Sequence, residues 1–150
     1  MTSPAARTAA AWAALMISHD FGDHVVQIDA QAVTKGKSGA EGIRACATHV
    51  ATYTATQAIT LAAANRLLDL RISWKRAAAG LAISAATHYI ADRQGGHWCD
   101  DEPRGIVRLA AATGHAGWLQ RDPNAGYLMD QSWHKAWLAV AAAVIGGGER

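Results

Sequence analysis

Residues that favour helices dominate the apolar and polar pattern of the chain, and runs that alternate like a strand are almost absent. Ser3 and Ser73 stand where helix N-caps are preferred, and Pro4 suits a first helical position because it needs no N–H there. The pattern predicts four main helices, which span Pro4 to Gln31, Ala40 to Leu70, Ser73 to Arg93 and Ala125 to Ile145.

Turn-forming residues separate these helices. The segment 35–39 is a loop by composition, and 94–124 is predicted to be an irregular connection that contains one short helix from Arg104 to Ala112. The glycine-rich end, 146–150, is expected to be a flexible tail. A chain of 150 residues fits one domain with a continuous core, so the prediction is an all-α, compact bundle over 1–150.

Composition indicates in which compartment the protein is expected. Hydrophobic residues make up 51%, but much of this is alanine, and the longest stretch without charged residues, 45–65, contains His49, Gln57 and five threonines. This favours a soluble bundle over a membrane-spanning protein, with inner-membrane association as the alternative. The N-terminus lacks a signal-peptide pattern, and Cys46 and Cys99 have no CxxC spacing, so we expect a cytoplasmic protein with free thiols.

Charge gives little support to nucleic-acid binding. The formal net charge is +2, and the basic residues are scattered rather than arranged in a stripe. A nucleic-acid-binding module would need one shared face for Arg44, Arg66, Arg71, Lys75 and Arg76.

A histidine and an aspartate stand four residues apart on three of the four predicted main helices, the first, the third and the last. On a helix, each pair would present an imidazole and a carboxylate side by side. One such pair alone is more simply explained as a surface ion pair. Three pairs flanked by apolar residues favour ligand pairs instead; they are His19 with Asp23, His88 with Asp92, and Asp130 with His134.

Converging pairs would form a metal centre. A lone buried histidine such as His49 is more often hydrogen-bonded in a core than a ligand, but the three pairs make ligation an equal alternative. A mixed imidazole and carboxylate set suits a divalent ion, with Zn or Mn favoured. The predicted ligands, enough for a mono- or dinuclear centre, are His19, Asp23, His49, His88, Asp92, Asp130 and His134.

Such a centre predicts a metal-dependent hydrolase, specifically a phosphoesterase that acts on a nucleotide or nucleic acid. Gln27 and Gln131 are expected to orient a ligand or water, and Arg93 to meet an anionic substrate, although an exposed arginine at a helix C-terminus is ordinary. The alternative is a non-catalytic helical protein whose buried pairs are structural.

The phrases HDFGDHVVQ, HYIAD and MDQSWH occur in an order that resembles the domain-of-unknown-function 3307 family of bacteria and phages. The resemblance covers about residues 11–144 and implies a small helical, often membrane-predicted protein with no established activity. This chain departs from the family's strong hydrophobicity. All-α zinc-dependent phospholipases and single-strand nucleases also use HxxxD pairs, but their N-terminal tryptophan ligand has no counterpart here.

Overall fold

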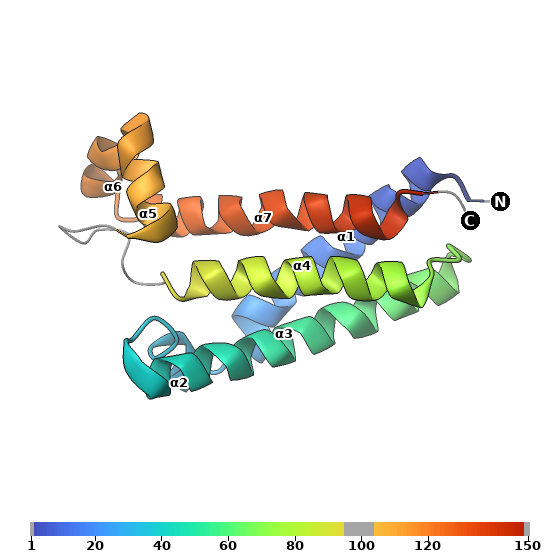
Figure 1. Ribbon diagram of the computed structural model, residues 1–150, viewed down its shortest axis with the longest axis horizontal. Coiled ribbons are helices and arrows are strands. Elements are labelled where there is room, and N and C mark those ends of the chain that lie inside the picture. Colours follow the sequence, from blue (N-terminus) through green and yellow to red (C-terminus); the bar gives the residue numbers. More distant parts are fainter. Residues whose placement is uncertain (1, 95–103, 149–150) are drawn as a thin grey trace.

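The structure is a computed structural model that describes residues 2–94 and 104–148. Within these ranges the chain forms helices and no strands, which confirms the all-α prediction. Four long helices build the bundle (Figure 1): α1 (Pro4–Phe21), α3 (Gly39–Leu67), α4 (Trp74–Asp92) and α7 (Ala125–Gly146).

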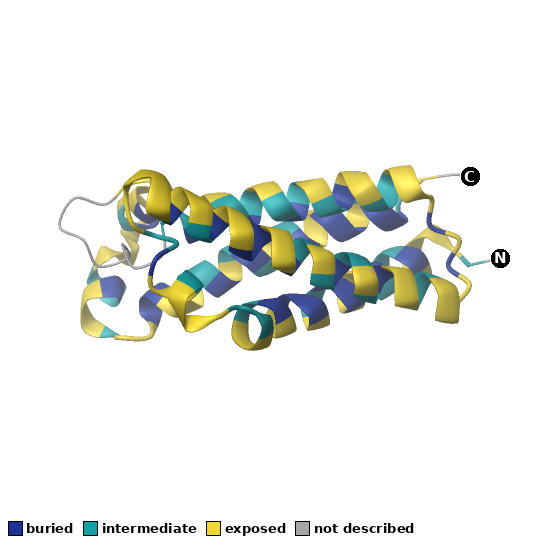
Figure 2. Ribbon diagram, turned by 90° about the horizontal axis from the view of Figure 1, so that it is seen from below, coloured by how far each residue is buried: buried dark blue, intermediate teal, exposed yellow. Residues whose placement is uncertain are grey.

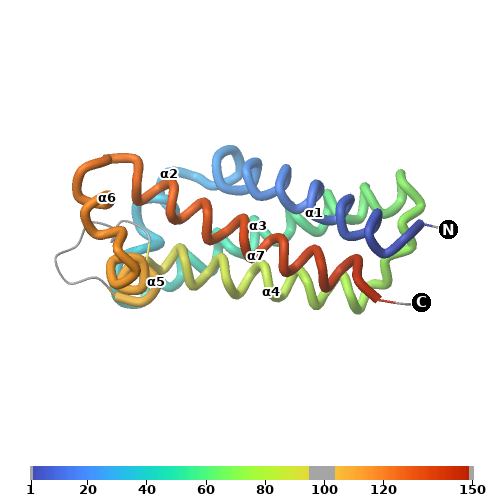
Figure 3. Tube along the Cα trace, turned by 90° about the horizontal axis from the view of Figure 1, so that it is seen from above, coloured from blue at the N-terminus to red at the C-terminus, as the bar shows by residue number. Residues whose placement is uncertain are grey.

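The bundle has up-down-up-down topology. Each long helix packs against two others, in the order α1, α3, α4, α7 around the bundle. Successive long helices run in opposite directions, and both chain ends lie at the same end of the molecule (Figures 1 and 3). Consequently the C-terminal part of α4 lies beside the N-terminal parts of α3 and α7.

Local sequence explains two of the helix starts. The Ser3 hydroxyl accepts a hydrogen bond from the Ala6 N–H, and Pro4 follows it at the first helical position. The Ser73 hydroxyl likewise accepts from the Arg76 N–H at the start of α4. Both predicted caps are confirmed.

The apolar core fills the half of the bundle nearest the chain ends, and buried residues line the inward faces of the helices (Figure 2). Small residues bring the helices close together: a Cβ atom on Gly80 would lie 2.3 Å from Cγ1 of Ile145, so only glycine permits this contact between α4 and α7. The leucine and isoleucine side chains buried in this core are Leu15, Leu61, Leu70, Ile72, Leu138 and Ile145.

The prediction of one helix from Pro4 to Gln31 is wrong beyond Phe21. The chain continues as a π-helix, η1 (Gly22–Val26), in which the Gln27 N–H donates to the Gly22 carbonyl at 3.0 Å. Gln27 then has extended backbone angles, with φ −63° and ψ 127°, and a short helix, α2 (Asp29–Ala32), follows. π-helical turns are wider than α-helical ones and are frequent at functional sites.

The second predicted helix ends at Leu67 rather than Leu70. Asp69 and Arg71 have positive φ angles of 43° and 57°, which no α-helix accommodates. The Asn65 side chain closes the turn by accepting a hydrogen bond from the Ile72 N–H at 2.9 Å.

The predicted connection 94–124 is more helical than expected within its described part. Three pieces replace the single short helix: α5 (Gly105–Ala110), the π-helix η2 (Ala111–His115) and α6 (Ala116–Arg121). They close on a small core of Ala110, Leu119 and Ala125. His97 and Cys99 lie outside the described residues.

Two further predictions concern the tail and the thiols. The last helix reaches Gly146, and the Gly148 carbonyl accepts from Arg7 at 2.8 Å, while 149–150 lie outside the described residues. Cys46 is a free, buried thiol, as predicted, and burial raises its pKa to about 12.

Across 2–94 and 104–148, every helix is too short or too polar to cross a membrane.

Candidate metal centre

The three histidine and aspartate pairs meet inside the half of the bundle farthest from the chain ends. The first pair comes from α1 and η1, the second from the end of α4, and the third from α7; His49 reaches in from α3. All seven predicted ligands therefore belong to one cluster. We call it the histidine–aspartate cluster: His19, Asp23, His49, His88, Asp92, Asp130 and His134.

Four atoms form the tightest part of this cluster. Nε2 of His49 and Nε2 of His88 are 3.0 Å apart. Oδ1 of Asp23 lies 3.2 Å from both nitrogens. Oδ2 of Asp92 lies 3.2 Å from His49 Nε2 and 3.3 Å from His88 Nε2. We call these atoms the four-donor set.

The spacing of the four-donor set matches a bound divalent ion. A tetrahedral ion with bonds of about 2.0 Å holds its ligands about 3.3 Å apart. An octahedral ion with bonds of about 2.1 Å holds adjacent ligands about 3.0 Å apart. The five separations that involve an imidazole nitrogen, 3.0 to 3.3 Å, are compatible with both geometries.

The donor atoms need a cation between them. Side chains of His49, His88 and Asp92 are 0%, 1% and 2% exposed, and that of Asp23 is 8% exposed. Oδ1 of Asp23 and Oδ2 of Asp92 are buried, and apart from the nitrogens of His49 and His88 neither has a hydrogen-bond partner among the described residues. A buried carboxylate oxygen without compensation costs several kcal/mol, so either a proton on an imidazole or a metal ion must supply the positive charge.

Protonation and metal binding compete for the same space. Burial lowers the pKa of His88, but Asp23 and Asp92 outweigh it and raise that pKa to about 9. Burial opposes ionisation of the two carboxyls, yet the hydrogen bonds to His49 and His88 hold the pKa of each carboxyl well below its usual range. The cluster therefore keeps both carboxylates charged and one imidazole ready to exchange a proton for a metal.

His19 lies next to the four-donor set but does not belong to it. Its Nε2 is 3.0 Å from Oε1 of Gln131, which can only accept, so Nε2 carries the hydrogen. Its Nδ1 is 3.3 Å from the Tyr53 hydroxyl and 3.6 Å from Oδ2 of Asp23. Burial lowers the pKa of His19, which favours this neutral form. Gln131 and the Tyr53 hydroxyl thus hold the ring of His19 in place. The predicted role of Gln131, to orient a ligand or a water molecule, stays a prediction.

A buried hydrogen-bond network of Tyr53, Gln57 and Ser84 contacts the histidine–aspartate cluster. The Gln57 amide donates to the Tyr53 hydroxyl at 2.8 Å, and the Ser84 hydroxyl donates to Gln57 Oε1 at 2.8 Å. The Tyr53 hydroxyl is then free to donate to His19, while its ring stacks on His88 with centroids 3.8 Å apart.

Sequence reasoning missed this network, although a signal existed. The four-residue spacing that marks the ligands extends along both helices, as His49, Tyr53 and Gln57 on α3 and as Ser84, His88 and Asp92 on α4. Continuing each polar column by one or two turns would have found all three residues.

The third pair, Asp130 and His134, lies on the side of Oδ1 of Asp92, the oxygen that is outside the four-donor set. Nε2 of His134 is 3.3 Å from Oδ2 of Asp130 and 3.9 Å from Oδ1 of Asp92. Lys35 also contacts this side, with Nζ 3.0 Å from the same Asp92 oxygen. No pattern in the sequence indicates Lys35, because a loop residue reaches the cluster only through the path of the loop.

Two predicted site residues have other surroundings. Gln27 lies after the π-helix, and its Nε2 is buried without a hydrogen-bond partner among the described residues. Arg93 donates from Nη1 to the carbonyls of Lys35 and Lys37, the latter at 2.9 Å. Arg93 therefore holds the loop that carries Lys35, and its position beside Asp92 serves that loop.

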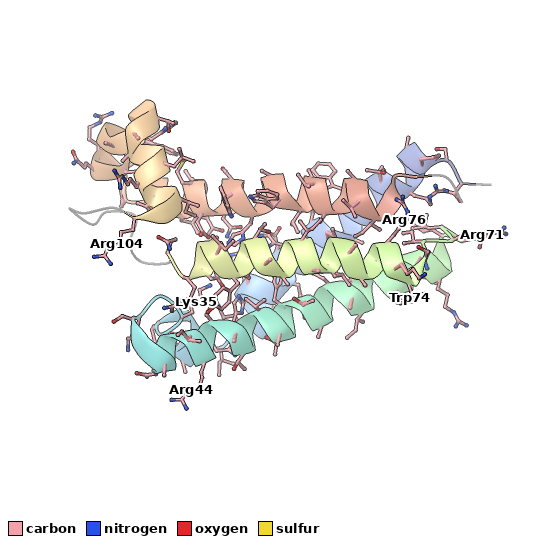
Figure 4. The ribbon with its side chains drawn as sticks, in the orientation of Figure 1. Lys35, Arg44, Arg71, Trp74, Arg76 and Arg104 are labelled. Carbon is pink, nitrogen blue, oxygen red and sulfur yellow. The ribbon has the colours of Figure 1, made fainter. Side chains whose placement is uncertain are left out.

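The basic residues do not form the single face that a nucleic-acid-binding module would need. Arg44 lies near the start of α3, whereas Arg71 and Arg76 lie at the opposite end of the bundle (Figure 4). Arg71 also pairs with Asp69 at 3.1 Å, and Arg76 donates to the Val144 carbonyl at 2.9 Å.

Comparisons of this chain with protein-family models, with curated proteins and with solved structures returned no match. The resemblance to the domain-of-unknown-function 3307 family stays a prediction, and functional inference depends on the cluster itself.

Proposed function

We propose that this protein is a metal-dependent hydrolase that cleaves a phosphoester, such as that of a nucleotide or nucleic acid. The observation that supports the proposal is the four-donor set: two imidazole nitrogens 3.0 Å apart, each within 3.2 to 3.3 Å of one carboxylate oxygen of Asp23 and one of Asp92. A divalent ion held there would lower the pKa of a water molecule and polarise a phosphoryl oxygen.

The number of open positions on the ion decides whether hydrolysis is feasible. Four protein ligands close a tetrahedral site, which is typical of structural zinc. The same four ligands leave two positions free on an octahedral ion, which is the geometry that Mn²⁺ prefers. The proposal therefore requires an ion with more than four ligands, and Mn²⁺ meets this requirement better than Zn²⁺.

Burial indicates the side from which a substrate would approach. Two side chains near Oδ1 of Asp92 are less enclosed than the four-donor set: Asp130 is 20% exposed and Lys35 is 15% exposed. The Lys35 ammonium there would contact a phosphate oxygen, and Nε2 of His134, which is buried without a hydrogen-bond partner among the described residues, would hold or accept a proton.

The test compares two isosteric substitutions, one within the four-donor set and one at an exposed aspartate. Asp92→Asn removes a ligand charge, whereas Asp20→Asn changes an exposed aspartate one residue beyond His19. With Mn²⁺ present, we expect hydrolysis of bis(p-nitrophenyl) phosphate or of a nucleotide to fall by about 1000-fold in Asp92→Asn and to change less than about twofold in Asp20→Asn.

Metal analysis gives an independent check. Protein purified without chelator should contain about one equivalent of divalent metal. Less than that, unchanged in the His88→Ala/Asp92→Ala double variant, would contradict the proposal.

The second candidate is a non-catalytic protein in which the pairs are structural. Nδ1 of His49 and Nδ1 of His88 are buried and have no hydrogen-bond partner among the described residues, whereas metal-bound histidines usually donate from this second nitrogen. This candidate predicts that chelators leave the melting temperature unchanged while the same double variant unfolds.

A further inference from the structure

Asp92 presents its two carboxylate oxygens to different positions. Oδ2 belongs to the four-donor set. Oδ1 points to the other side, where His134 and Asp130 stand ready as further ligands. In dinuclear hydrolases, two ions about 3.5 to 4 Å apart act together on the substrate, and a carboxylate placed like Asp92 would bridge them. The position beside Oδ1 is therefore where a second ion would bind.

Lys35 already occupies that position. Its Nζ lies 3.0 Å from Oδ1 of Asp92, and its side chain is only 15% exposed. An ammonium at this distance uses the lone pairs that a second ion would need.

The loop conformation fixes Lys35 in place. Nη1 of Arg93 binds the carbonyls of Lys35 and Lys37, which ties the loop to the end of α4. The loop also lies directly against α3: a Cβ atom on Gly42 would lie 1.9 Å from the Lys37 carbonyl oxygen, so glycine is required there. Figure 4 shows Lys35 beside the C-terminal end of α4, where Asp92 lies.

The formal charges of the enclosed side chains also favour one bound metal ion. With neutral imidazoles, Asp23, Asp92 and Asp130 carry three negative charges and Lys35 carries one positive charge. One divalent ion makes this enclosed group neutral, whereas two ions leave two uncompensated positive charges. Burying net charge is costly, so a single ion is favoured while Lys35 is present.

We propose that the centre binds one metal ion and that Lys35 takes the place of a second ion. This inference rests on the proposed function and specifies its metal stoichiometry. Lys35 supplies a fixed positive charge on the substrate side of Asp92, and loss of its side chain opens Oδ1, His134 and Asp130 to a second ion.

The test counts ions in the full chain. The protein is stripped of metal, dialysed against excess MnCl₂ and desalted, and manganese per chain is measured by elemental analysis. We expect one Mn²⁺ in the unsubstituted protein, two in Lys35→Ala and one in Lys35→Arg, because arginine restores the positive charge. Lys37→Ala, an exposed lysine two residues along the same loop, should keep one ion.

Electron paramagnetic resonance provides a second readout that a merely destabilised protein would not change. An isolated Mn²⁺ gives a six-line spectrum, and two neighbouring ions give a broadened, exchange-coupled one. We expect the coupled spectrum in Lys35→Ala alone, with circular dichroism confirming that each variant is folded.

Each alternative outcome is decisive. Two ions in the unsubstituted protein, or one in folded Lys35→Ala, would overturn this inference and leave the proposed hydrolase standing. No bound ion in any form would overturn both.

Discussion

The two halves of this bundle share the same four helices, but one half has an apolar interior and the other a polar one. Near the chain ends, α1, α3, α4 and α7 enclose leucine, isoleucine and alanine side chains. In the other half they enclose the histidine–aspartate cluster and the Tyr53 network. Helix propensity does not separate the halves, since alanine is abundant throughout.

The difference shows how stability and chemistry are distributed. The apolar half gains stability from burial alone, at about 25 cal/mol per Å² of apolar surface. The polar half carries desolvated charges that need a cation to compensate them. A fold in which one half is independent of metal can hold a reactive centre in the other half. Substitutions in the two halves should consequently give different responses to metal.

The largest expected effect is on activity and comes from the polar half. His88→Ala removes a nitrogen that lies 3.0 to 3.3 Å from the other members of the four-donor set. We expect metal-dependent hydrolysis to fall by about 1000-fold or more, which corresponds to about 4 kcal/mol. Steady-state kinetics and metal content measure this loss. Bound metal and activity that both survive in His88→Ala would show that His88 is not a ligand.

The matched substitution in the apolar half should act on stability alone. Leu138 is 2% exposed and lies in the apolar core on α7, about one turn after His134. Leu138→Ala should lower the free energy of unfolding by about 2 to 5 kcal/mol through a cavity. Urea denaturation measures this change, and metal stoichiometry should stay the same. A lost ion in folded Leu138→Ala would show that the halves are not independent.

How far sequence could predict these halves depends on whether a feature is local. The helix α4 was predicted within one residue at each end, because its cap and apolar spacing are local signals. The seven clustered residues were also found, because the four-residue spacing is local. The break after Phe21 was missed, since the column His19, Asp23 and Gln27 looks like continuing helix until a π-turn displaces its last member.

Long-range features had no such signal. Lys35 meets Asp92 across 57 positions, and Arg93 reaches back to the Lys35 carbonyl, so both roles depend on the tertiary path of the loop. The division of labour among the seven residues was hidden for the same reason. Only the distances separate the four-donor set from His19, which binds Gln131, and from the Asp130 and His134 pair.

The pH dependence of the metal-free protein should sharpen the contrast further. The pKa of His88 is raised to about 9 from 6.5, so its stabilising charge is fully present below pH 6.5 and is lost as the pH rises through 9. The pKa values of Asp23 and Asp92 are lowered from 3.8, so their contribution is present above pH 3.8 and is lost as the pH falls below it.

We expect metal-free protein to lose stability of about 2 to 3 kcal/mol between pH 7 and 10. A bound ion replaces the proton on His88, so metal-loaded protein should lack this alkaline loss. Urea denaturation of both forms across the range measures the difference. Leu138→Ala should lower both curves equally, and parallel curves for loaded and metal-free protein would argue against metal binding at His88.

The smallest expected effect comes from the network beneath the cluster. Tyr53→Phe removes the hydroxyl that lies 3.3 Å from His19 Nδ1 but keeps the ring that stacks on His88. His19 then loses one of its two partners, and its ring, which lies beside that of His88, is held less firmly. Loss of such a supporting contact typically weakens metal affinity about 10-fold. Titration calorimetry with Mn²⁺ measures this change, with Tyr127→Phe as the exposed control. An unchanged affinity would mean that Gln131 alone orients His19.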